Sequence, residues 1–131
     1  MGSKVDTPKH SQVRVMVVED EPSFQQLVEL VLSLDPRFEI VVSADSGEMA
    51  LEELADAHPD LALLDFRLPG IDGLETARRI KELCPDIKIA LVTAHTEEVL
   101  GRLAMEAHVE EVIPKADFNL SRVYRVLERR L

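Results

Sequence analysis

Leu61-Ala62-Leu63-Leu64-Asp65-Phe66-Arg67-Leu68-Pro69-Gly70 is the stretch that decides the fold: an apolar run ends at an aspartate, and a Pro-Gly turn follows. Apolar runs without alternation are typical of parallel strands that are covered on both faces. Two more such runs end at charged residues, namely Val15-Met16-Val17-Val18 before Glu19-Asp20, and Val112-Ile113-Pro114 before Lys115. Ligands of such sheets bind at the carboxyl ends of the strands. We therefore expect three carboxylates and one ammonium group to converge at one edge of a sheet.

Strand-like and helix-like segments alternate along the chain. Strand patterns cover residues 13–18, 39–43, 61–65, 87–92 and 109–114. Helical spacing of apolar residues begins behind Pro22, Ser46 and Asp72, and continues over residues 96–107 and 118–131. Pro22 suits a first helical turn, and Asp72 with Glu75 has the spacing of a capping box. This alternation predicts right-handed crossovers and a doubly wound α/β fold with a parallel sheet.

Length and composition limit the function classes. The 131 residues fit one domain, and we expect residues 1–11 to be a flexible leader and residues 12–131 to form the domain. A formal net charge of −10 argues against direct binding of nucleic acid. No apolar run reaches the roughly 20 residues of a membrane span. Cys84 is the sole cysteine, which fits a reducing compartment, so we expect a cytoplasmic protein.

The clustered carboxylates of Glu19, Asp20 and Asp65 need a partner. Like charges about 4 Å apart repel by roughly 4 kcal/mol at an effective dielectric near 20, and a divalent cation resolves this conflict. Oxygen ligands favour Mg²⁺ or Mn²⁺ over Zn²⁺. Taken singly, the acids also suit a helix start and a turn, so those interpretations stay open. A strand-end aspartate such as Asp65 can attack phosphorus and form an aspartyl phosphate, and Lys115 could hold one of the phosphoryl oxygens. Thr93 could offer a hydroxyl group to the phosphoryl group, although taken alone that hydroxyl equally suits a hydrogen bond to the local backbone.

These motifs resemble the receiver domain of two-component response regulators. The resemblance rests on Val-Val-Glu19-Asp20-Glu-Pro, the Asp-x-x-Leu-Pro-Gly-x-Asp-Gly stretch that starts at Asp65, Val-Thr93-Ala94 and Ile-Pro-Lys115. It implies a five-stranded parallel sheet in the order 2-1-3-4-5, a flavodoxin-like three-layer sandwich. It also implies that Asp65 is the phosphoacceptor, and that Mg²⁺ is bound by Asp20, Asp65, the backbone carbonyl of Arg67 and, mostly through water, Glu19. The phosphoryl oxygens would be contacted by Thr93, Lys115 and the backbone amide of Ala94.

The sequence departs from the family pattern at two positions. Val112 stands where many receivers carry an aromatic residue that swings inward on activation, so another route has to carry that change. Ala116 follows Lys115 where many receivers have proline, which argues against a cis peptide bond there because such bonds are costly without proline. Arg67 and His95 lie two residues beyond Asp65 and Thr93, at positions that in this family border the phosphoryl group and tune its loss.

The resemblance implies a signalling domain rather than an enzyme, with a sensor histidine kinase or a phosphotransfer protein as donor. Its output would be a downstream protein target or an effector domain missing from this chain. The last two helices offer a docking face or a face for a homodimer, although their charged side chains also suit ordinary solvated helix faces. We expect this surface to carry Glu97, Glu98, Glu106, Glu110 and Glu111 opposite Arg122, Arg125, Arg129 and Arg130. A haloacid-dehalogenase-type phosphatase is the leading enzymatic alternative, but it needs a second aspartate where Arg67 stands. A flavodoxin-like cofactor binder lacks a phosphate loop here, because Glu19-Asp20-Glu21 would repel phosphate. A pseudo-receiver that is never phosphorylated is the third alternative.

Overall fold

The computed structural model describes residues 12–94 and 98–129, which form a parallel five-stranded sheet in the order β2-β1-β3-β4-β5. The strands are β1 (Val13–Val18), β2 (Phe38–Ala44), β3 (Leu61–Leu64), β4 (Lys88–Thr93) and β5 (Glu111–Pro114). The helices are α1 (Pro22–Ser33), α2 (Gly47–Ala57), α3 (Gly73–Leu83), α4 (Glu98–Glu106) and α5 (Leu120–Glu128), with a 3-10 turn η3 (Lys115–Asp117). The doubly wound α/β fold and the 2-1-3-4-5 order are confirmed.

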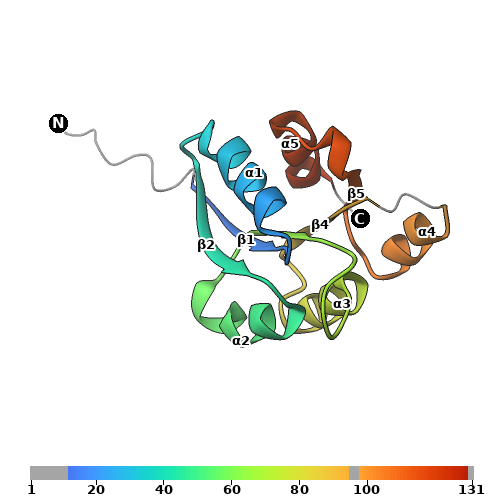
Figure 1. Cartoon of the computed structure of the whole chain (residues 1–131). Helices are drawn as coiled ribbons and strands as arrows, with labels where there is room; N and C mark the ends of the chain where they lie inside the picture. Colours follow the sequence, from blue (N-terminus) through green and yellow to red (C-terminus); the bar gives the residue numbers. More distant parts are fainter. Residues whose placement is uncertain (1–11, 95–97, 130–131) are drawn as a thin grey trace.

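Two layers of helices cover the sheet (Figure 1). On one face, α1 and α5 bury side chains such as Val28 and Val123 against Val15, Val17 and Leu63. On the other face, α2, α3 and α4 pack a larger cluster on Met16, Val18, Leu64 and Leu91. The central strands are therefore buried on both sides, which explains their unbroken apolar sequence. None of the described helices is long and apolar enough to cross a bilayer.

The helix starts follow their capping residues. The carboxylate of Glu21 accepts a hydrogen bond from the amide of Phe24, and Pro22 occupies the first turn of α1, as predicted. Ser46 caps α2 by accepting from the Met49 amide. Asp72 caps α3 by accepting from the Glu75 amide at 2.8 Å. Each cap satisfies an amide that has no partner inside its own helix.

Several predicted boundaries were wrong. The last strand begins at Glu111 rather than residue 109, because His108 adopts a left-handed conformation (φ 63°) that turns the chain before it joins the sheet. The last helix begins at Leu120 rather than residue 118, because Asn119 caps it by accepting from the Arg122 amide. The strand predicted to end at Asp65 ends at Leu64, and β4 starts and ends one residue later than expected. The predicted start of the fourth helix at residue 96 lies outside the described residues, as do residues 1–11.

Candidate phosphoacceptor and metal site

The ends of β1 and β3 bring the three predicted carboxylates together. Glu19 and Asp20 follow β1 and Asp65 follows β3, and one carboxylate oxygen of each lies within 4.8 Å of the others. Backbone hydrogen bonds fix the strand ends, since the Asp65 amide donates to the Val18 carbonyl at 2.9 Å. Glu19 and Asp65 are buried, whereas Asp20 is exposed. The cluster therefore opens to solvent on the side of Asp20.

Lys115 supplies positive charge to this cluster from the end of β5. Its Nζ lies 3.0 Å from Glu19 Oε1 and 3.1 Å from Asp65 Oδ2. The same Nζ lies 4.6 Å from the ring centroid of Phe24, whose ring packs edge-on against Phe118. An aromatic face attracts an ammonium group, so Phe24 supports the position of Lys115. The sequence showed Phe24 only as one apolar residue of α1, and its contact with the lysine was missed.

Burial and hydrogen bonding oppose each other at Glu19 and at Lys115, and the pKa of each group is raised as a net result. Burial is the largest influence on Glu19 and raises its pKa, although hydrogen bonds from Lys115 and from the Glu21 amide oppose the rise. Burial alone would lower the pKa of Lys115, but its hydrogen bonds to Glu19 and Asp65 outweigh burial and raise that pKa. The ammonium group therefore stays charged between the two buried carboxylates.

The remaining predicted residues lie at the same edge. Thr93 ends β4, is fully buried, and pairs in register with Pro114, the residue before Lys115. Ala94 follows it and is exposed. Arg67 is exposed, and its amide donates to Asp65 Oδ1 over a long 3.4 Å. His95 and Thr96 lie outside the described residues. The edge thus holds a hydroxyl group, an ammonium group and a carboxylate cluster on neighbouring strands.

The loop between Asp65 and α3 is tightly built. The Gly73 amide donates to the Phe66 carbonyl at 2.7 Å, which closes the loop at its base. A Cβ atom on Gly73 would lie 2.0 Å from the Asp65 carbonyl oxygen, so only glycine fits there. Gly70 has a φ of 76°, a left-handed conformation that glycine adopts without strain. The backbone conformation at residue 70 and the close contact at residue 73 therefore explain the glycines of the Pro69-Gly70 and Asp72-Gly73 pairs.

The donor set fits Mg²⁺ or Mn²⁺. Among the described residues, three carboxylates converge and neither His nor Cys joins them, and Mg²⁺ and Mn²⁺ prefer oxygen ligands. Exposed Asp20 leaves a path for a hydrated ion, which keeps several of its waters when bound. The acidic cluster at this edge, which the sequence predicted, is thus present in the structure.

Glu110 and Glu111, which were expected on the charged surface of the last two helices, lie immediately before and at the start of β5 and are bound within the chain. Glu110 is buried, and its carboxylate binds Lys81 Nζ at 2.9 Å and the Ile89 amide at 2.7 Å. Glu111 is engaged within the chain by Arg129 at 2.5 Å. Glu97 and Arg130 of that expected surface lie outside the described residues. Val112 is half-buried on β5. The described residues contain no cis peptide bond, as expected from Ala116 after Lys115.

The fold and this edge define a doubly wound α/β protein with an acidic site at the carboxyl ends of its strands. A sequence model described as the response regulator receiver domain matches residues 15–127, and the chain belongs to this family. It is the receiver domain of a two-component response regulator.

Individual relatives agree with this assignment. The probable transcriptional regulatory protein NarL of Mycobacterium tuberculosis is 35% identical over 102 residues, which covers 78% of this chain and 47% of NarL. A protein-glutamate methylesterase/protein-glutamine glutaminase of Syntrophus aciditrophicus is 37% identical over 107 residues, covering 79% of this chain and 30% of that protein. The chain thus spans less than half of the length of these relatives.

Solved structures show the same architecture. The signal receiver domain of NarL from Mycobacterium tuberculosis superposes with a TM-score of 0.81 at 30% identity, covering 91% of this chain and 99% of that one. A CheY-like receiver domain protein from Methanospirillum hungatei JF-1 has a TM-score of 0.80 at 21% identity, covering 90% and 93%, and shares the fold.

Proposed function

We propose that this receiver domain accepts a phosphoryl group on the carboxylate of Asp65, with Mg²⁺ or Mn²⁺ bound beside it. One observation carries the proposal: a strand-end carboxylate lies within 4.8 Å of two other carboxylates and 3.1 Å from the ammonium of Lys115. A nucleophilic carboxylate needs positive charge on the side where the phosphoryl oxygens arrive. A cation held by the carboxylate cluster would supply this charge on one side, and the ammonium of Lys115 supplies it on the other.

The residues take distinct roles in the transfer. An oxygen of Asp65 forms a bond to phosphorus, and the bond from phosphorus to the donor nitrogen of a phosphohistidine breaks, so that the imidazole leaves with the electron pair of that bond. The ammonium of Lys115, the hydroxyl of Thr93 and the amide of Ala94 hold the phosphoryl oxygens. Asp20, Asp65 and the carbonyl of Arg67 would hold the metal directly, and Glu19 would hold it mostly through water. When bound, the metal offsets the negative charge of the phosphoryl group.

The proposal extends to the partners. The donor is a sensor histidine kinase or a phosphotransfer protein, and the output is a downstream protein or an effector domain in a longer chain. Relatives carry such names as transcriptional regulatory protein and methylesterase, and this chain matches less than half of each. We assign to this chain no enzymatic activity beyond transfer to itself and loss of that phosphoryl group, and no nucleic-acid binding.

The same proposal covers the domain limits, the location and the oligomeric face. Residues 12–131 form the receiver domain, preceded by a leader of residues 1–11, and the protein acts in the cytoplasm. A homodimer through the last two helices would use the exposed Val99, Leu103 and Met105 of α4, which supports that face. The phosphatase alternative gains no support, because the position for a second acid is held by exposed Arg67.

The test is the intact mass of the protein after incubation with acetyl phosphate. The wild-type protein should gain one phosphoryl group with Mg²⁺ and none with a chelator. Asp65→Asn keeps the shape of the side chain and removes its nucleophilic charge, so its mass should stay unchanged. Equal labelling of this variant would exclude Asp65 as the acceptor, and no labelling of either protein would favour a pseudo-receiver.

A further inference from the structure

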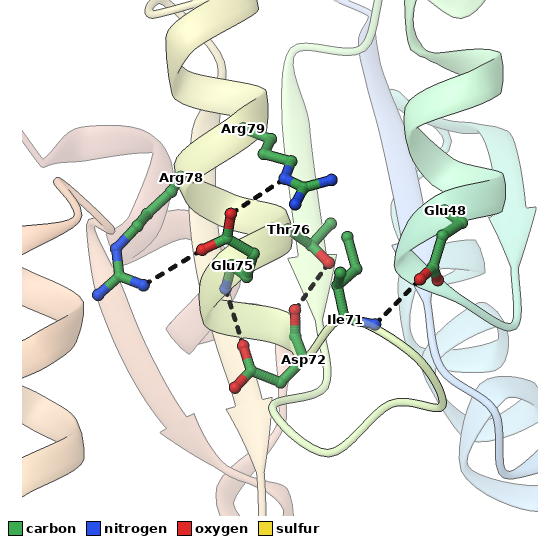
Figure 2. A network of polar contacts seen from close by, with 7 residues as sticks. All are labelled: Glu48, Ile71, Asp72, Glu75, Thr76, Arg78 and Arg79. Atoms are coloured by element: carbon green, nitrogen blue, oxygen red, sulfur yellow. Dashed lines mark hydrogen bonds and ion pairs between the residues drawn. The ribbon is translucent and has the colours of Figure 1, made fainter.

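The loop of residues 66–72 is held from outside the site by a side chain of the neighbouring helix. Glu48 lies in the first turn of α2, and its Oε2 accepts a hydrogen bond from the Ile71 amide at 3.0 Å. Figure 2 shows the Glu48 carboxylate reaching across from α2 to this amide. The contact joins residues 23 positions apart, so no local sequence pattern announces it.

The carboxylate of Glu48 also covers Gly70. A Cβ atom built on Gly70 would lie 2.4 Å from Glu48 Oε2 and 2.7 Å from Oε1. The left-handed Gly70 and the acceptor on α2 are therefore matched, since a side chain at residue 70 would displace the carboxylate. The Ile71 hydrogen bond is also the main reason why the pKa of Glu48 is lowered, so the group is an ionised acceptor at neutral pH.

Helix α3 fixes the end of the loop at residue 72. Asp72 accepts from the Glu75 amide with its side chain, and its carbonyl accepts from the buried hydroxyl of Thr76 at 2.8 Å. Figure 2 shows these contacts beside the Glu48 contact, with Glu75 paired to Arg78 and Arg79. Residues 70–72 are thus held between α2 and α3. The start of the loop is held by the Asp65 amide, which donates to the Val18 carbonyl, and by the Phe66 carbonyl, which accepts from the Gly73 amide.

We propose that Glu48 is a positioning residue that holds the phosphoacceptor loop from α2 and thereby sets the Arg67 carbonyl relative to the Asp65 carboxylate. This inference rests on the proposed function, in which that carbonyl binds the metal. Arg67 lies between the two fixed ends of the loop. If the Ile71 amide loses its partner, the loop can move and carry the Arg67 carbonyl away from the carboxylate cluster. Because metal ligands need tight geometry around Mg²⁺, loss of the tether weakens metal binding without removing a ligand.

The experiment measures Mg²⁺ affinity by chemical-shift titration and amide exchange at Ile71 in four proteins. These are the wild type, Glu48→Ala, Glu48→Gln and Glu52→Ala. Glu52 is exposed, lies one turn further along α2, and provides the same loss of charge without the contact. Glu48→Gln loses the charge but keeps an oxygen that accepts from the Ile71 amide, so it separates tethering from simple electrostatic attraction.

Glu48→Ala should bind Mg²⁺ about three- to tenfold more weakly than Glu52→Ala, the factor expected for one net hydrogen bond. It should also exchange the Ile71 amide faster and melt a few degrees below Glu52→Ala, because the same hydrogen bond contributes to the stability of the fold. Glu48→Gln should recover part of both losses. Equal Mg²⁺ affinity in Glu48→Ala and Glu52→Ala, or an unchanged Ile71 amide, would overturn the positioning role. Failure of the wild type to bind Mg²⁺ would instead overturn the proposed function itself.

Discussion

Replacing Gly73 with alanine is predicted to displace the backbone that carries Asp65. The new Cβ would lie 2.0 Å from the carbonyl oxygen of Asp65, 2.8 Å from its carbonyl carbon and 2.9 Å from the Cα of Phe66. All three are backbone atoms, so no side-chain rotation relieves the clash. The loop has to open at its base, where the Gly73 amide now donates to the Phe66 carbonyl at 2.7 Å.

Overpacking of a tight contact costs about 1–3 kcal/mol, and a stretched hydrogen bond adds about 1 kcal/mol. Alanine returns up to about 1 kcal/mol because it is a better helix former than glycine. The net loss is therefore about 1–3 kcal/mol, or a melting temperature lower by roughly 4–12 °C for a chain of this size. Gly101→Ala is the matched control, because among the described residues no atom beyond its chain neighbours and the backbone of α4 lies within 4 Å of its Cβ position. That variant should gain up to about 1 kcal/mol.

The two alanine variants should be compared by thermal unfolding and by Mg²⁺ titration. Gly73→Ala should melt below the wild type and bind Mg²⁺ more weakly, since the clash moves the Asp65 backbone. Gly101→Ala should melt at or above the wild type with unchanged Mg²⁺ affinity. A Gly73→Ala protein that matches Gly101→Ala in both measurements would refute the claim that this contact fixes the loop.

Three further predictions follow from the site and its surroundings. Lys115→Met leaves Glu19 and Asp65 facing each other without an ammonium group, which should cost about 1–3 kcal/mol, and Mg²⁺ should raise its melting temperature more than that of the wild type. Hydrogen bonds from Arg37 and Tyr124 hold the pKa of Asp35 well below the usual 3.8. The contribution of Asp35 to stability is therefore complete above about pH 4 and is lost as the pH falls toward the folded-state pKa. Asp35→Asn should melt lower than the wild type at neutral pH, and its melting temperature should fall less steeply on acidification. Thr93 is predicted to transmit the conformational change that follows phosphorylation. Beryllofluoride with Mg²⁺, which mimics the aspartyl phosphate, should then change amide exchange across β4 and α4 in the wild type but not in Thr93→Ala. The same change in amide exchange in Thr93→Ala would exclude transmission through Thr93.

The fold could be predicted because its signals are local. Runs such as Leu61–Leu64 are apolar throughout, since the sheet buries both of their faces. The charged residues directly after three such runs then had to share one edge, and the structure brings Glu19, Asp20, Asp65 and Lys115 together there. Parallel topology alone turns these separate sequence positions into one cluster.

The missed features depend on contacts between distant residues. Glu48 looks like any acid in a first helical turn, and only the packing of α2 beside the loop gives it the Ile71 amide. Asp35 accepts from the hydroxyl of Tyr124, 89 positions away, at 2.6 Å. Glu110 was expected on the charged surface of the last two helices because charged residues are seldom buried, but Lys81 and the Ile89 amide satisfy its carboxylate inside the fold. Sequence spacing carries no sign of such partners.

The most direct test of the central claim is to locate the phosphoryl group by chemistry. Protein treated with acetyl phosphate and Mg²⁺ can be reduced with borohydride, which converts an aspartyl phosphate to homoserine, and then digested for peptide mass mapping. We predict homoserine at residue 65 alone, and none when a chelator replaces Mg²⁺. Homoserine at residue 20, or an unmodified residue 65 in phosphorylated protein, would contradict the assignment of Asp65 as the phosphoacceptor.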